Sequence, residues 1–207
     1  MLDGGVGVDG VFYYGSDAGV SVNLRSGTSS GGYAEGDTLV SIENLSGSHF
    51  DDILVGNVEN NLLRGGSGND HIYGGEGNDT IAGDKGYDVL EGGEGHDEFQ
   101  FYQSQISEVD IITDFGDGDD FIHFFQMKTE DIRIASGHGE AIRQNDYGDS
   151  TVEDAILYRT HGTADTADDT AFAILIDYKG GLYFMGWSEK NEFWFFSSRQ
   201  HNHHVKH

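Results

Sequence analysis

The sequence predicts an all-β fold, in which a solenoid of short parallel strands is followed by a β-rich C-terminal cap or small sandwich. Two observations predict it: an uninterrupted nine-residue repeat from Gly47 to Gln100, and longer apolar runs after residue 123. A repeat of fixed length dictates the architecture, because each unit packs on its neighbours. The six units read GSHFDDILV, GNVENNLLR, GGSGNDHIY, GGEGNDTIA, GDKGYDVLE and GGEGHDEFQ.

Each unit combines a glycine-rich turn with a short strand. All six units open with Gly, carry Asp or Asn at the sixth place, and have Leu, Ile or Phe at the eighth. The first half holds too much glycine for a helix or a strand, whereas glycine suits the positive φ angles of a tight turn. In the last three residues we expect Ile72 to point inward and His71 and Tyr73 outward, because strand side chains alternate.

Two units are expected to complete one turn of a flattened coil, so units eighteen residues apart stack. Asp52, Asp70 and Asp88 then line one edge, and the other edge is lined by Asn61, Asp79 and Asp97. The stack concentrates charge, since residues 47–100 hold twelve acidic side chains against two basic ones. The inward apolar set is small, at about 2 kcal/mol for each side chain: Leu54, Leu63, Ile72, Ile81, Leu90 and Phe99. A bound cation is therefore predicted, and carboxylate and carbonyl oxygens favour Ca²⁺.

The pattern G-G-x-G-x-D-x-U-x is an established calcium-binding β-helix repeat. On these residues the chain resembles the RTX (repeats-in-toxin, haemolysin-type calcium-binding) family of bacterial secreted proteins, and it is similar to the serralysin C-terminal domain. The resemblance implies a parallel β-roll with roughly two to five Ca²⁺ ions between stacked turns. The ligands that it implies are Asp70, Asp79, Asp88, Asp97, Asp52, Asp9 and Asn61, with the backbone carbonyls of Gly66, Gly68, Gly75, Gly77, Gly83 and Gly92.

The match to the repeat is uneven along the array. Phe50 and Glu59 stand in place of the fourth glycine, Asn61 in place of the Asp, and Asp84 in place of the second glycine. The resemblance therefore places the strongest sites between turns 65–70 and 83–88, and between turns 74–79 and 92–97. The first two units are expected to be incomplete sites.

Composition excludes several classes of partner. The chain has 207 residues, a formal net charge of −26 and a pI near 4.3, and it has no cysteine. Such a charge argues against nucleic acid or an anionic membrane as a partner, and disulfide or thiol chemistry is excluded. No apolar run reaches membrane-spanning length, and no secretory signal peptide is present at the N-terminus. The resemblance implies a secreted, extracellular protein that leaves through the type I secretion machinery and has a further domain upstream.

The repeat has outlying pieces on both sides. Gly4 to Phe12 forms one more unit, with Asp9 at the sixth place, so we expect the chain to begin inside a repeat array and Met1 to be internal. The period lapses between residues 13 and 46, where strands are expected at residues 20–24 and 38–42 around a Ser/Gly loop. Asp37 and Glu43 are expected on a solvated face in this stretch, in preference to a cation site.

The segment after the last repeat resembles the closing segment of the family. It comprises residues 110–122, and whether Asp114 or Asp117 binds a further ion stays open. Further strands are expected at residues 131–135, 155–158, 171–178, 181–185 and 192–196, with a hairpin at residues 179–181. The aromatic residues around Trp187 and Trp194 are expected in the core of this cap. The expected division is residues 1–46 (degenerate repeat and lead-in coil), 47–123 (β-roll with closing segment), 124–196 (β-rich cap) and 197–207 (disordered tail).

No catalytic motif is present: H-E-x-x-H, G-x-S-x-G and G-x-x-x-x-G-K are all missing from the sequence. His49, His71, His96 and His123 are expected to be surface residues. Three functions stay open. The first is a non-catalytic calcium-binding module for folding, stabilisation and secretion. The second is the C-terminal portion of a secreted enzyme, such as a serralysin-like metalloprotease, a lipase or an alginate epimerase. The third is a fragment of an adhesin or a surface layer.

Overall fold

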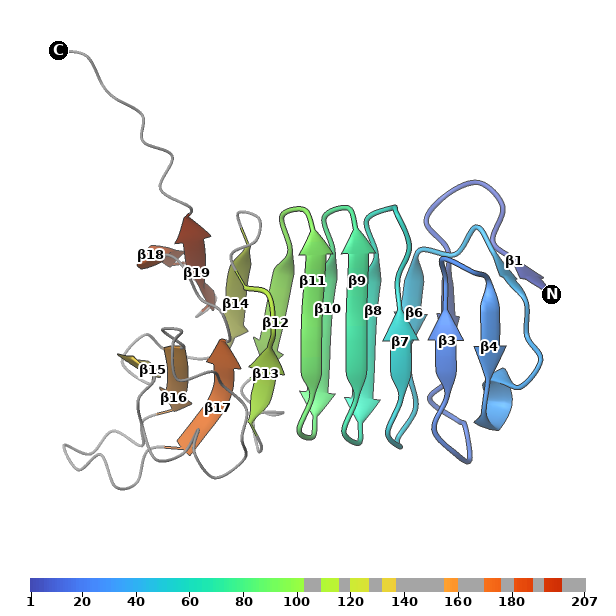
Figure 1. Ribbon diagram of the computed structural model, residues 1–207, viewed down its shortest axis with the longest axis horizontal. Helices are drawn as coiled ribbons and strands as arrows, with labels where there is room; N and C mark the ends of the chain where they lie inside the picture. The colour runs from blue at the N-terminus through green and yellow to red at the C-terminus, as the bar shows by residue number, and fades with distance from the viewer. Residues whose placement is uncertain are drawn as a thin grey trace, which may run out of the picture.

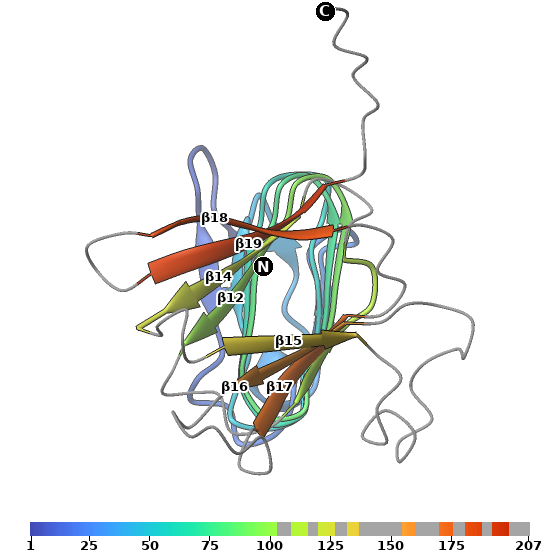
Figure 2. The same cartoon turned by 90° about the vertical axis from the view of Figure 1, so that its left-hand side faces the viewer.

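The computed structural model describes residues 1–102, 109–115 and 120–126 with their side chains, and the backbone of five further strands after residue 131. The described chain is a parallel β-roll, a flattened coil with one sheet on each broad side (Figure 1). The view along the coil shows the two sheets facing each other across a narrow interior (Figure 2). The predicted all-β fold is confirmed, and the only helix among the described residues is the short 3-10 helix η1, Gly32–Ala34.

Successive strands alternate between the two sheets, which makes the coil. In the repeat, the first sheet contains β8 (Leu62–Ser67), β10 (Thr80–Lys85) and β12 (Glu98–Tyr102). The second sheet contains β7 (Ile53–Val55), β9 (His71–Glu76) and β11 (Val89–Glu94). Neighbours within a sheet are parallel and eighteen residues apart, as in the pairing of Leu63 with Ile81 and of Ile72 with Leu90.

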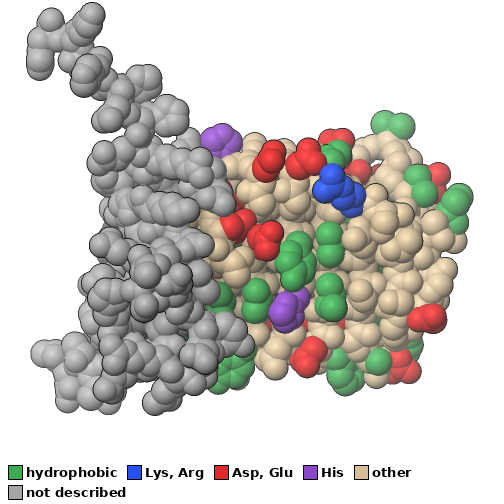
Figure 3. All heavy atoms as spheres, viewed as in Figure 1, with side chains coloured by type: hydrophobic (Ala, Val, Ile, Leu, Met, Phe, Trp, Pro, Cys, Tyr) green, Lys and Arg blue, Asp and Glu red, His purple; other side chains and the backbone are tan. Residues whose placement is uncertain are grey.

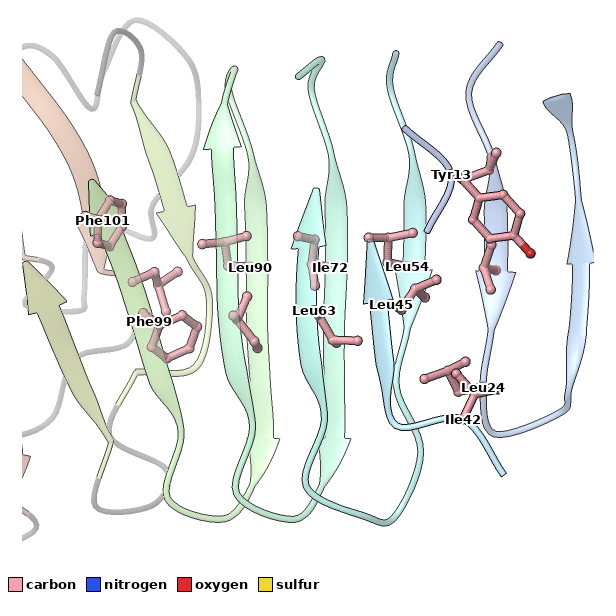
Figure 4. Close-up of a cluster of buried hydrophobic side chains, with 14 of the residues drawn as sticks. Tyr13, Leu24, Ile42, Leu45, Leu54, Leu63, Ile72, Leu90, Phe99 and Phe101 are labelled. Carbon is pink, nitrogen blue, oxygen red and sulfur yellow. The ribbon is translucent and has the colours of Figure 1, made fainter. Parts of the chain in front are cut away.

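The eighth-position side chains fill the interior between the sheets (Figure 4). Ile72 is buried, while His71 is exposed and Tyr73 half-buried, as the alternation predicts. Leu54, Leu63, Ile72, Ile81, Leu90 and Phe99 are at most 1% exposed. The core also extends beyond the repeat at both ends, since Val22 and Leu45 are buried on one side and Ile112, Phe115 and Ile122 on the other.

The strands are longer than expected, because they include glycines that we assigned to turns. β8, β9, β10 and β11 each have six residues and continue through the first three residues of the next unit. The expectation that the glycine-rich half forms no strand was wrong. Gly75 pairs with Gly93 across the sheet although Gly75 has φ +117° and Gly93 φ +97°. Glycine adopts this positive-φ conformation readily. Because each coil has a glycine at the same place, the paired strands keep the same conformation and stay in register.

The coils of the roll continue upstream of residue 47, although the nine-residue sequence pattern is not recognisable there. β2 (Gly10–Phe12) pairs with β6 (Asn44–Ser46), and β6 pairs with β8, so Val11, Leu45 and Leu63 are in register. In the other sheet, β3 (Ser21–Asn23) pairs with β7. The expectation that the period lapses up to Ser46 was wrong for residues 38–46, which form an in-register unit. The true interruption is the insertion that follows β3.

This insertion contains β4 (Thr28–Ser30) and η1 and returns through β5 (Leu39–Val40). β4 pairs antiparallel with β3 and occupies the outer edge of that sheet. β5 pairs with β1 (Leu2–Asp3) in a separate two-stranded sheet. The expected strands at residues 20–24 and 38–42 are thus present in shorter form.

The C-terminal strands extend both sheets of the roll. β13 (Asp110–Ile112) pairs with β17 (Thr170–Leu175), which is followed in the sheet by β16 (Ala155–Arg159) and β15 (Ile132–Ser136). β14 (Phe121–Phe125) pairs with β19 (Glu192–Ser198), and β19 pairs with β18 (Gly181–Trp187). The β-rich cap is confirmed, and its strands continue the roll as added antiparallel edges apart from β17, which is parallel to β13.

The expected hairpin at residues 179–181 was wrong. β17 has β13 and β16 on its two edges, so it has no free edge for β18, which lies in the other sheet. The side chains of Trp187 and Trp194, and the whole of the tail at 199–207, lie outside the described residues. No helix of the described chain is long and apolar enough to span a bilayer.

Candidate metal centre

The sixth-position side chains form two buried ladders, one along each edge of the roll. On one edge the Oδ1 atom of Asp70 accepts from the backbone N–H of Asp52 (2.9 Å), and the Oδ1 atom of Asp88 accepts from that of Asp70 (2.8 Å). On the other edge Asp79 and Asp97 accept in the same way from Asn61 and Asp79 (2.8 Å each). Each carboxylate therefore reaches back to the preceding coil, and the predicted stacking at eighteen residues is confirmed.

The ladders continue onto Asp110 and Asp120, which the sequence reasoning did not single out, and onto Glu43, which it placed on a solvated face although the residue is half-buried. Asp110 accepts from the N–H of Asp88 (3.1 Å), and Asp120 accepts from the N–H of Asp97 (3.1 Å). At the other end Glu43 accepts from the N–H of Asp9 (2.9 Å). Insertions displace Asp110 and Asp120 from the nine-residue count, whereas Glu43 keeps it in a unit without glycine. Each of the three precedes a buried apolar residue by two places: Leu45, Ile112 and Ile122. That local pair, an acidic residue followed two places later by an inward apolar residue, was the available signal.

The first glycine of each unit makes room for the carboxylate. A Cβ atom built on Gly65 would contact Oδ2 of Asp70 and would lie 2.7 Å from the carbonyl oxygen of Gly83 on the next coil. Gly74 has the same relation to Asp79 and to the carbonyl of Gly92. Any side chain at these positions would displace the carboxylate, and this explains why every unit opens with glycine.

The second carboxylate oxygen lacks a hydrogen-bond partner on several turns. Within the described part of the chain, Oδ2 of Asp9, Asp70, Asp79 and Asp97 is buried and accepts no hydrogen bond. Burial raises the pKa of Asp70 to about 8, that of Asp97 to about 7 and that of Asp79 to about 6. A buried acceptor without a donor is costly. A divalent cation would supply the missing partner and hold these groups ionised, so the residues fit a calcium ion.

Turn carbonyls lie between the same pairs of coils. The carbonyl oxygens of Gly68, Gly75 and Gly77 face the α-carbons of the matching glycines one coil later, and those of Gly83 and Gly92 face Gly65 and Gly74 one coil earlier. Gly66 lies in β8 opposite Asp84. No three His, Cys, Asp or Glu side chains gather as a metal-binding cluster within the ranges described. The donor set that this geometry offers is carboxylate plus main-chain oxygen, and hard cations prefer such oxygens.

Asp52 and Asn61 take their places in the ladders but differ from the later Asp residues. Both oxygens of Asp52 accept hydrogen bonds from its own turn or the preceding coil. The amide of Asn61 is likewise engaged through its oxygen and its nitrogen. In both turns the polar side-chain atoms of the sixth residue have hydrogen-bond partners.

Asp114 serves a different turn. It occupies the place of an opening glycine, and its carboxylate accepts from the N–H groups of Gly92 (3.0 Å) and Gly93 (2.7 Å). Burial raises its pKa to about 6. Asp117, the other candidate in this segment, lies outside the described residues.

Two further residues depart from expectation. Asp84, at the second place of its unit, keeps the positive φ (+74°) of the glycine that it replaces, and it forms a two-point ion pair with Arg64 (2.7 and 3.1 Å). His49, His71 and His96 are exposed as expected, but His123 is only 8% exposed, so the surface assignment was wrong. Its Nδ1 atom lies 2.6 Å from Glu98 Oε1, and this contact between β12 and β14 explains its burial.

Acidic side chains are spread over the visible face of the roll, where basic side chains are sparse (Figure 3).

The model of the RTX calcium-binding nonapeptide repeat (4 copies) matches residues 46–81 and 73–100. Among solved structures, the solution structure of the AlgE6R3 subunit from the Azotobacter vinelandii mannuronan C5-epimerase is similar, with 25% identity and a TM-score of 0.41 over 61% of this chain and 70% of that chain. No curated protein matches the chain. Residues 46–100 thus match the RTX calcium-binding nonapeptide repeat and are folded as a parallel β-roll.

Proposed function

We propose that this chain is a non-catalytic, extracellular module whose central coils fold and are stabilised when Ca²⁺ binds between stacked turns. The observation that carries the proposal is the set of buried carboxylates whose second oxygen has no hydrogen-bond partner, at Asp70, Asp79 and Asp97. An ionised buried carboxylate with no partner for one of its oxygens opposes folding. Because the ion binds only where the coils are stacked, its binding free energy adds to the stability of the folded state.

In this proposal each carboxylate has two tasks. Its Oδ1 atom holds the preceding coil through a backbone N–H, and its Oδ2 atom faces the ion, together with carbonyl oxygens of the turns. Asp88 belongs to the same ladder and is the corresponding ligand of its turn. A bound Ca²⁺ supplies charge compensation, while the chain positions the oxygens and excludes water from them. An affinity of about 10⁻⁴–10⁻³ M is expected for an extracellular module of this kind.

The secretion role belongs to the same proposal. Cytosolic calcium is too low to occupy sites of such affinity, so the central coils would stay unfolded during export through type I machinery and would fold outside. The module would then serve a larger secreted protein. Since RTX repeats are a binding element, catalytic residues of that protein would lie upstream, in a domain such as a metalloprotease, a lipase or an epimerase.

A calcium titration followed by far-UV circular dichroism tests the central claim. The strand signal should rise in the millimolar range and reverse with EDTA. The double variant Asp70→Asn with Asp97→Asn should lose most of this response, because it removes two charged oxygens but keeps both Oδ1 acceptors. The matched control is Asp17→Asn with Glu94→Gln, which removes two charges from exposed positions and should respond like the wild type. A full strand signal in EDTA, unchanged by calcium, would refute the coupling.

A further inference from the structure

The turn at residues 47–52 is closed by its own side chains. Oδ2 of Asp52 accepts from the backbone N–H of Ser48 (2.5 Å), and Oδ1 accepts from Ser48 Oγ (2.9 Å) and from the N–H of Val20 (2.7 Å). Ser48 stands where later units have Asn57, glycine or Asp84, so a hydroxyl is available at this place only here. Both oxygens of this buried carboxylate thus have donors, which Oδ2 of Asp70 and of Asp97 lacks.

The turn at residues 56–61 is closed without any charge. Asn61 accepts from the N–H of Asn57 through Oδ1 (2.8 Å). Its amide nitrogen donates to the carbonyl of Glu43 (3.1 Å) and to Oδ1 of Asn57 (3.2 Å). An aspartate could not make the last two bonds, because a carboxylate has no donor. The asparagine therefore replaces by hydrogen bonds what the later turns leave open at Asp79 and Asp97.

The coils that contain these two turns also have a core of their own. Ten buried apolar residues lie upstream of residue 65: Tyr13, Val20, Val22, Leu24, Ala34, Leu39, Ile42, Leu45, Leu54 and Leu63. The antiparallel strand β4 covers the outer edge of β3. Asp9 is the exception in this part, since its Oδ2 atom lacks a partner. It lies on the outermost turn, however, and its side chain is only part-buried.

We infer that the roll has two zones with different calcium requirements. Residues 1–64, the calcium-independent zone, fold on hydrogen bonds and apolar packing alone. Residues 65–100, the calcium-dependent zone, fold only when the ion is bound, because there the Oδ2 atoms of Asp70, Asp79 and Asp97 are buried without a donor. The inference rests on the proposed function for the second zone and adds to it a preformed N-terminal template, onto which the next coil can pair through β8–β10 and β7–β9.

Hydrogen exchange of the whole chain, in EDTA and in millimolar calcium, tests this division. Two reporters lie in each zone: the amides of Tyr13 and Ile53, bonded to Ser46 and Val20, and those of Val89 and Glu98, bonded to Asp70 and Asp79. Removal of calcium should change the first two protection factors by less than about threefold. It should lower the other two by about tenfold or more, since one site at about ten times its dissociation constant contributes about that factor.

The outcomes separate the inference from the proposed function. If all four amides lose protection in EDTA, the two-zone inference is overturned while calcium-driven folding stands. If all four stay protected, calcium is not needed for the second zone and the proposed function fails. Loss of protection in the first zone alone overturns both.

A pair of variants tests the cause. Asn61→Asp introduces a charge and removes both amide donations, so in EDTA the amide of Gly47, bonded to Arg64, should exchange at least about tenfold faster. Asn60→Asp adds the same charge one residue away. The new carboxylate can still accept from the N–H of Asn78, as Asp51 accepts from that of Asn69. In this variant the amide of Gly47 should therefore exchange like that of the wild type. Equal exchange in the two variants would overturn the role given to Asn61.

Discussion

Without calcium, the roll should become more stable as the pH is lowered from about 8 to about 5.5, the reverse of ordinary acid denaturation. Burial raises the pKa of Asp70 from 3.8 to about 8 and that of Asp97 from 3.8 to about 7. A folded-state pKa above the unfolded value means that protonation favours the folded state. Stability is therefore fully present below about pH 4 for these groups and is lost as the pH rises through about 7 to 8.

The size of the effect follows from the pKa shifts. Each pH unit between the pKa values of a group in its two states changes the free energy of unfolding by about 1.4 kcal/mol. Over the interval from about pH 8 to about pH 5.5, Asp70 contributes about 3 kcal/mol and Asp97 about 2 kcal/mol. Their sum is comparable with the whole stability of a small domain, which is about 5–15 kcal/mol.

Circular dichroism in EDTA at several pH values, with urea unfolding wherever residues 65–100 are folded, measures this dependence. In millimolar calcium the slope should reverse or flatten, because protons then compete with the ion for the same oxygens. The variant Asp70→Asn with Asp97→Asn should lose most of the EDTA slope, whereas Asp17→Asn with Glu94→Gln should keep it. A calcium-free wild type that loses stability on acidification over this interval contradicts the reasoning, because it would show that the buried carboxylates are ionised and partnered without the metal.

Two further substitutions test the packing. Gly65→Ala should destabilise the calcium-bound roll by at least about 2 kcal/mol, because the new methyl group meets the Asp70 carboxylate and the next coil. Thermal unfolding in calcium measures it, with Gly15→Ala as the control, where the nearest atom would be 3.7 Å away. Ile72→Ala should cost about 2–5 kcal/mol, and Ile53→Ala, at a side chain 48% exposed, much less. Similar urea midpoints for the two isoleucine variants would show that the interior of the roll is not the stabilising core.

The repeat alone predicted the coil, its two edges and its inward residues, because every property repeats at the same interval. A single register satisfies all six units at once, and it places Ile72 inside and Asp70 and Asp88 in one stack. The same interval misled where insertions occur. Asp110 and Asp120 occupy sixth places in space, but the residues inserted before them disturb the count in sequence. Glu43 keeps the count, but its unit has none of the glycines that mark the others.

The local sequence pattern also could not predict which strands pair when they are distant in the chain. The glycine signal at residues 179–181 was read as a hairpin, yet β17 already has two neighbours, and its place is decided by β13 far upstream. The burial of His123 depends in the same way on Glu98 of the adjacent strand. Neither contact can be predicted from the residues next to it in the sequence.

By itself the sequence determined the repeat unit, the β-roll and the calcium chemistry, since spacing and residue type are enough to state which oxygens recur on one edge. Only the tertiary structure decided which of those oxygens lack a partner. Asp52 and Asp70 look alike in the sequence, but Ser48 and Val20 donate to the first, while the second oxygen of the other accepts no hydrogen bond. The physical reason is that satisfaction of a buried polar atom depends on donors brought to it by neighbouring coils as well as by its own turn.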